Sequence, residues 1–147
     1  FLRTHELRYF ELLPEKEDET FVLQLVDELR EQRFSLSQRD AIAALLHHIN
    51  ATKLLLDYIE YSQSLDLLRR YGAYLLQAHK QEAYRLHRQM IDTYLNQHFG
   101  PQAADRVADF IAHLRVIRAS DLAAELLLDY RKRFADRPSL MEALEVF

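Results

Sequence analysis

The sequence predicts an all-α protein, and two observations lead to this prediction. The 147 residues contain only two glycines and three prolines, whereas a β-sheet protein needs many tight turns built from Gly, Pro and Asn. Between those few breaks, long stretches of Leu, Ala, Arg, Glu, Gln and Tyr place apolar side chains at helical spacing. We therefore expect a single all-helical domain over residues 1–147, which starts at Phe1 rather than Met and is expected to be a piece of a longer protein.

The first helices follow from caps and apolar stripes. Thr4 is expected to cap a short helix that Pro14 stops. Asp18 is expected to cap the next helix, because acidic residues there suit the positive end of a helix dipole. The apolar stripe of that helix consists of Phe21, Val22, Leu25, Val26 and Leu29.

A third helix is predicted at Ser37, because Asp40 three residues later completes a variant of the capping box. Its apolar stripe runs to Ile49 and resumes at Leu55. The periodicity leaves open whether Asn50 divides this segment into two helices.

Ser64 is the predicted cap of a helical pattern that runs from Leu65 to Tyr94. Helices in globular proteins average about 11–12 residues, so we expect a turn at residues 79–81. Gly100 is expected to supply the left-handed residue after this region, and Pro101 the first turn of the next helix.

Two further signals complete the series of helices. Ser120 is the predicted cap of a helix with Leu122, Leu126 and Tyr130 in its stripe. Pro138 is the predicted start of a last short helix.

Helices joined by such tight links predict antiparallel hairpins. The preferred arrangement is a short α-solenoid, a right-handed stack of the tetratricopeptide or HEAT kind, and the alternative is a compact helical bundle. Residues 29–35 resemble residues 114–120, which favours a repeat, although helix ends share such residues in any case. A strict tetratricopeptide pattern fails, because Tyr84 stands where its second helix needs a small residue.

The segment from Tyr130 to Met141 resembles the tail of helical hairpins that follow SWIM zinc fingers in bacterial proteins. There, a helix ending in Tyr or Phe is followed by Arg-Pro, a small residue, Leu and a short closing helix. The preceding hairpin, from Pro101 to Tyr130, is similar in style. The chain has no Cys, so the resemblance implies the helical part without the zinc module.

The composition argues against most kinds of chemistry. The lack of Cys excludes disulfides, thiol catalysis and cysteine-ligated zinc, which fits a cytoplasmic protein. Two isolated glycines cannot form a phosphate-binding loop, and no Gly-x-Ser-x-Gly elbow is present. No apolar run approaches the roughly 20 residues that span a bilayer. We expect no enzyme activity, no cofactor and no membrane partner.

The histidines offer little for a metal site. Asp109 with His113, and His79 with Glu82, have the spacing of two ligands on one helix face. Neither pair recurs on a second helix, so ordinary hydrogen-bonded histidines are expected. Convergence of His79, His87 and His113 would reverse this interpretation.

Two groups of arginines with interleaved tyrosines are the candidate partner-binding residues. Both groups are rich in the residue types of interface anchors and of phosphate and base contacts. The alternative is a solvated helix face with its aromatic residues turned inward. The candidates are Arg69, Arg70, Tyr74, Arg85, Arg88, Arg115, Arg118, Arg131 and Arg133.

The sequence thus favours a non-enzymatic helical scaffold that mediates protein–protein interaction. The alternative function is a nucleic-acid-associated accessory domain, although the net charge of −4 does not give the basic surface usual for that class. A protein partner is expected, with nucleic acid as the alternative, and self-association through apolar edges is the third expectation.

Overall fold

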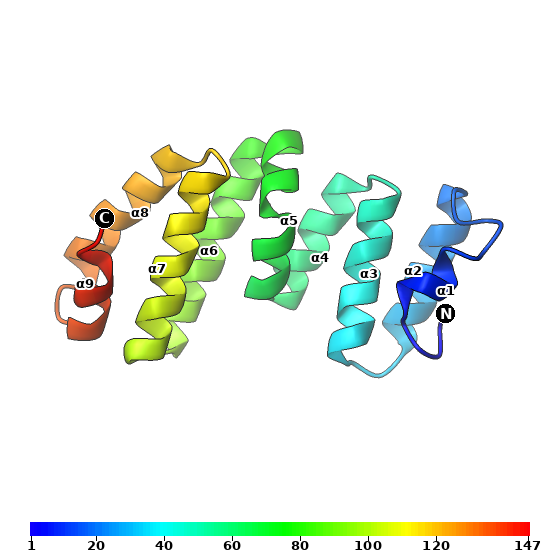
Figure 1. Cartoon of the computed structure of the whole chain (residues 1–147), viewed down its shortest axis with the longest axis horizontal. Helices are drawn as coiled ribbons and strands as arrows, with labels where there is room; N and C mark the ends of the chain where they lie inside the picture. Colours follow the sequence, from blue (N-terminus) through cyan, green and yellow to red (C-terminus); the bar gives the residue numbers. More distant parts are fainter. The chain divides into compact units, whose positions relative to one another are not determined.

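The computed structural model describes residues 1–147 and contains nine α-helices and no strand (Figure 1). The predicted all-α class is confirmed. The helices are α1 (Leu7–Phe10), α2 (Glu19–Glu31), α3 (Leu36–His48), α4 (Thr52–Ser62), α5 (Leu65–Ala78), α6 (Lys80–Gln97), α7 (Pro101–Val116), α8 (Ser120–Arg133) and α9 (Pro138–Leu144). They belong to two compact units, residues 1–67 and residues 68–147.

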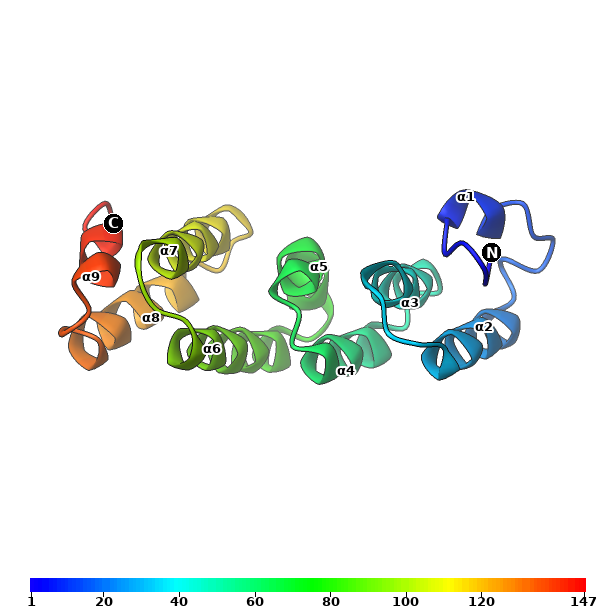
Figure 2. The same cartoon turned by 90° about the horizontal axis from the view of Figure 1, so that it is seen from below.

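The first unit has two layers of helices. Figure 2 shows α2 and α4 in one layer and α1 and α3 in the other, and α3 packs against both α2 and α4. Apolar residues at helical spacing fill the space between the layers, which is the physical reason why these segments fold together. Those that are at most 1% exposed include Leu29, Ile42, Leu45, Leu46, Leu55, Leu56 and Ile59.

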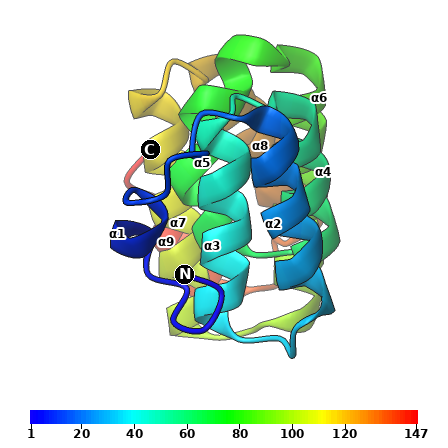
Figure 3. The same cartoon turned by 90° about the vertical axis from the view of Figure 1, so that its right-hand side faces the viewer.

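Helix α1 is a single turn that tertiary contacts hold in place. A four-residue helix has no stability of its own, but the ring of Phe10 is buried and meets the ring of His48 edge-on at 5.1 Å. The imidazole of His5 also bonds to the Ser37 hydroxyl at 2.9 Å. Figure 3 looks onto this end of the first unit, where α1 lies beside α3.

The predicted start of α1 at Thr4 is wrong. Glu6 occupies the N-cap position and makes no capping bond through its side chain. The Thr4 hydroxyl instead accepts a bond from the backbone N–H of Glu6 at 3.3 Å. This local bond stabilises the turn before the helix, which is a common alternative for a Thr side chain.

Of the two other caps predicted in the first unit, one is confirmed and one is wrong. Asp18 caps α2 as predicted, by accepting a bond from Phe21 N at 3.3 Å. The capping box at Ser37 is wrong, because Ser35 Oγ accepts from Gln38 N at 3.1 Å and is the N-cap of α3. Ser37 lies in the first turn of that helix, where its hydroxyl meets His5.

The second unit also has two layers, with α6 and α8 in one and α5, α7 and α9 in the other (Figure 2). Helix α7 packs against α8 and α9. The turn expected at residues 79–81 is confirmed, since α5 ends at Ala78 and α6 begins at Lys80. Fully buried side chains between the layers include Leu75, Leu86, Leu95, Ile111, Leu114 and Tyr130.

In the second unit, corresponding helices of neighbouring hairpins lie side by side and run in the same direction. Along α6 and α8, Tyr84 contacts Asp121 at 2.6 Å, Arg88 contacts Glu125 at 2.8 Å, and further on Asp92 contacts Arg133 at 2.8 Å. The residue numbers rise together on both helices, so α6 and α8 run parallel.

The corner between α3 and α4 and the corner between α7 and α8 have the same backbone structure. This structure explains why Ser120 is not a cap. In both, a non-glycine residue adopts a left-handed conformation, with φ of 56° at Asn50 and 66° at Arg118. The next N–H, that of Ala51 or Ala119, donates back to the preceding helix at 2.9 or 2.8 Å, as in a Schellman motif.

The matched corners decide how two segments of the chain divide into helices. Asn50 divides its segment into α3 and α4. Ser120 is not a cap, because the corner places Ala119 at the N-cap of α8 and makes Ser120 its first residue. Thr52 holds the same first position in α4.

Most of the remaining helix boundaries agree with those predicted from the sequence. Ser64 accepts a bond from Leu67 N at 3.2 Å, as expected of a cap. Pro101 and Pro138 each begin a helix. Gly100 has the expected positive φ of 89°, but it is the N-cap of α7 rather than the residue that ends α6.

Candidate functional site

A groove lies in the second unit where α5 ends, α6 begins and α7 turns into α8. We call it the corner groove. Its volume is about 600 Å³, and its lining combines apolar side chains with two cations. The lining residues are Ala73, Leu76, Gln77, Lys80, Tyr84, Val116, Ile117 and Arg118.

Arg118 enters the corner groove from a constrained backbone position. It is the left-handed residue of the α7–α8 corner, a conformation that costs a non-glycine residue about 1–2 kcal/mol. Its guanidinium makes no hydrogen bond, ion pair or ring contact within the chain. The corner therefore presents a free cation beside apolar surface.

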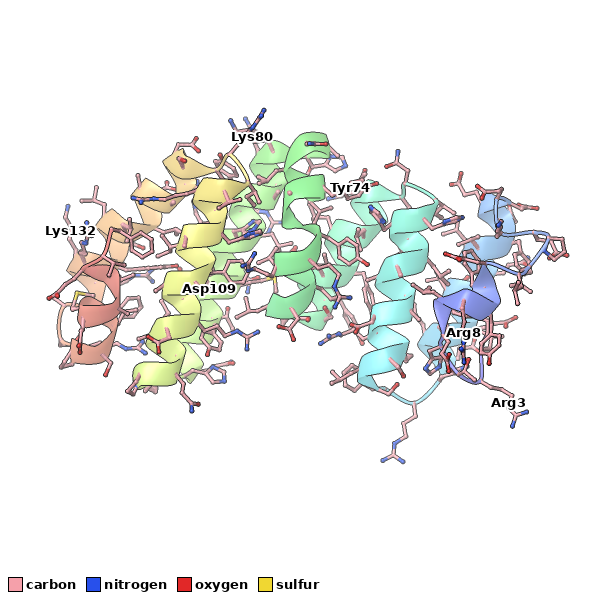
Figure 4. All side chains as sticks on the ribbon, viewed as in Figure 1. Arg3, Arg8, Tyr74, Lys80, Asp109 and Lys132 are labelled. Atoms are coloured by element: carbon pink, nitrogen blue, oxygen red, sulfur yellow. The ribbon has the colours of Figure 1, made fainter.

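Tyr84 and Lys80 form the wall contributed by α6. The Tyr84 hydroxyl donates a 2.6 Å bond to Asp121, and the Lys80 ammonium lies 5.5 Å from the centre of the Tyr84 ring. Burial, together with this bond, raises the pKa of Tyr84 to about 12, and the same bond holds the pKa of Asp121 below its usual value. Figure 4 shows Lys80 at the start of α6, extending away from the helix.

The first group of predicted arginines is mostly engaged with carboxylates. Arg69 on α5 lies 3.4 Å from Asp109, and Arg88 on α6 lies 2.8 Å from Glu125. Arg70 and Arg85 are exposed and also interact within the chain.

Tyr74, the aromatic member of the predicted set, is half-buried on α5 (Figure 4). Burial raises its pKa. It does not line the corner groove.

The second group of predicted arginines also serves the fold. Arg133 bonds to Asp129 at 2.6 Å as well as to Asp92. Arg131 donates to the backbone carbonyls of Leu144 and Phe147, both at 3.1 Å. The guanidinium carbon of Arg115 lies 5.0 Å from the centre of the Phe147 ring.

Of the nine predicted residues, Arg118 is the one that lines the corner groove. Lys80 and Tyr84 belong to the same Arg/Tyr-rich stretches but did not stand out as candidates. Lys80 lies at the predicted turn, residues 79–81, and Tyr84 lies one helical turn after it, so the turn is the signal that could have found them. No motif or spacing in the sequence marks the apolar residues Val116 and Ile117 as part of a site.

Arg137 is a structural residue that the candidate list lacks. It donates to the carbonyls of Leu95 at 2.7 Å and His98 at 2.6 Å, where α6 ends. A cation suits this position, because the last carbonyls of a helix have no partner within it.

Two histidines of the second unit have a buried ring nitrogen, and of these His87 is completely buried and His113 half-buried. His87 donates from Nδ1 to the Ala83 carbonyl at 2.7 Å, and Nε2 of both His87 and His113 has no hydrogen-bond partner. Burial lowers the pKa of His87 to about 4 and also lowers the pKa of His113. The structure contains no group of three or more His, Cys, Asp or Glu side chains that could hold a metal ion.

The first unit has a larger hollow of about 700 Å³. Its lining residues are Phe1, Leu2, Arg3, Thr4, Tyr9, Leu13, Phe21 and Leu25. Arg3 is the one charged residue among them, whereas the corner groove combines two cations with apolar side chains. The corner groove is therefore the stronger candidate site.

None of the nine helices is both long and apolar enough to cross a membrane. Comparison with known proteins gives no match to a family model, to a curated protein or to a solved structure.

Proposed function

We propose that this chain is a non-enzymatic helical scaffold that binds a protein partner in the corner groove. The observation that carries the proposal is the pairing, in one groove, of exposed apolar surface with an unpaired cation. Val116 is 79% exposed although it is apolar. Fully burying a side chain of this kind contributes about 1.5–3 kcal/mol.

The scaffold that we propose is a short α-solenoid. Parallel alignment of like helices in successive hairpins supports it, as do the matched corners of α3–α4 and α7–α8. The offset of 85 residues that relates residues 29–35 to residues 114–120 also relates four apolar residues of α2 to four of α7. All eight are buried: Val22, Leu25, Val26, Leu29, Val107, Phe110, Ile111 and Leu114.

Small-angle X-ray scattering tests the solenoid. A compact chain of this length has a radius of gyration of about 15 Å, and we expect a clearly larger value. A radius of about 15 Å would favour the compact bundle.

Nucleic-acid binding receives less support from the same residues. Arg69, Arg88 and Arg133 lie against carboxylates, and a phosphate group would have to displace them. Exposed ion pairs of this kind contribute only about 0–1 kcal/mol to folding, yet they reduce the positive potential that attracts nucleic acid.

Site-specific photo-crosslinking in cell extract tests the protein partner. Benzoylphenylalanine replaces Val116 in one variant and Val146, which is 81% exposed, in the control. We expect a discrete protein adduct from position 116 that survives nuclease and is absent from position 146. Equal labelling from both positions, or adducts that nuclease removes, would contradict the proposal.

A further inference from the structure

We propose that the corner groove recognises a short acidic segment of its partner, with an Asp or Glu next to a Leu, Ile or Val. This inference rests on the proposed function and specifies the chemistry of the partner. It follows from two properties of the groove, namely the charge of its lining and the apolar side chains beside that charge.

The charge of the groove favours an anion. Lys80 and Arg118 both line it, and Asp121, the carboxylate beside Lys80, already accepts the Tyr84 hydroxyl. Arg118 has no partner, and a guanidinium binds a carboxylate through two parallel hydrogen bonds. One carboxylate of the partner would therefore find the donors of an unpaired guanidinium here.

The apolar side chains that line the groove favour an apolar neighbour to that carboxylate. Ala73 and Leu76 come from α5, and Val116 and Ile117 come from the end of α7. The side chain of Gln77, which is exposed, lies along the same edge and can bond to the backbone of an extended segment. Apolar contact with a few placed polar groups is the usual composition of a recognition site.

A selection experiment on the full chain tests the inference. Random 12-residue peptides displayed on phage are selected against the protein, and enriched peptides are synthesised with fluorescein for anisotropy measurements. We expect the enriched peptides to carry Asp or Glu beside an aliphatic residue and to bind less tightly as salt is raised.

Arg118→Asn is the decisive variant, because Asn50 holds the left-handed position of the matching corner. The substitution removes the cation and leaves a residue that tolerates this backbone conformation. We expect unchanged or higher thermal stability and an affinity lowered about tenfold or more, as for the loss of a hydrogen bond to a charged group. Lys132→Asn, at an exposed cation of α8 (Figure 4), is the matched control and should change affinity less than about twofold.

Val116→Ser separates this inference from the proposed function. Enriched peptides that lack acidic residues but lose affinity for Val116→Ser would overturn the acidic segment and keep the protein-binding groove. Peptides that bind wild type, Arg118→Asn and Val116→Ser equally would overturn both. A selection that enriches no peptide, or a chain that binds single-stranded DNA but no peptide, would also contradict both.

Discussion

Acidification should destabilise the second unit through His87, and this prediction can be worked out from the structure. The imidazole is completely buried, and burial lowers its pKa from 6.5 to about 4. In the unfolded chain the same group regains a pKa near 6.5. Between these two values the unfolded state binds a proton that the folded state excludes.

The sign and size of the effect follow from linkage. Because the folded pKa is the lower one, the contribution to stability is fully present above pH 6.5 and is lost as the pH falls towards 4. The expected loss from His87 is about 2 kcal/mol between pH 7 and pH 5 and about 3 kcal/mol by pH 4. The pKa of His113 is lowered in the same direction, so it adds to the loss.

Urea unfolding followed by circular dichroism measures this dependence. His87→Leu removes the titrating group and its unpartnered Nε2 atom, so the free energy of unfolding should fall less between pH 7 and pH 5 than in the wild type. His47→Gln, at an exposed histidine of α3, should keep the wild-type dependence. Parallel pH curves for wild type and His87→Leu would refute the reasoning.

Three further substitutions test other parts of the structure, each by urea unfolding. Gly72→Ala should lower the free energy of unfolding of the wild type by about 1 kcal/mol, because the new Cβ would lie 3.2 Å from His87 Nε2. In a His87→Ala background the same substitution should raise the free energy of unfolding by a similar amount. Arg137→Ala should cost about 1–3 kcal/mol, because two carbonyls at the end of α6 lose their charged donor; no change would contradict its capping role. Ser35→Ala should cost about 1 kcal/mol and Ser37→Ala clearly less, since Ser35 is the N-cap of α3; the reverse order would restore the capping box.

Local signals predicted most helix boundaries because these depend on neighbouring residues. Asp18 and Ser64 bond to N–H groups three residues ahead, and Pro101 and Pro138 fit the first turn of a helix. Ser120 had the same local signal, but the hydrogen bonds of the α7–α8 corner shifted the helix start by one residue. Where the hydrogen bonds of a corner and a local cap favour different first residues, the sequence alone does not decide where the helix begins.

The candidate site was harder to predict because it depends on residues distant in sequence. The arginines stood out by composition, yet the carboxylates that engage Arg69 and Arg88 lie on α7 and α8. The corner groove is lined by Lys80 and Arg118, which come from two different hairpins. Neither these ion pairs nor the groove leaves a periodic signal in the sequence. The sequence therefore indicates the residue types but not which cation is unpaired.

The corner at Arg118 also bears on how long a bound partner would stay. Backbone hydrogen bonds fix where its Cα lies, while the guanidinium, without a partner, keeps its rotamer freedom. Ordering a side chain of this length costs up to about 2 kcal/mol on binding. Because such costs weaken a complex mainly through faster dissociation, we expect a partner bound at this corner to dissociate quickly.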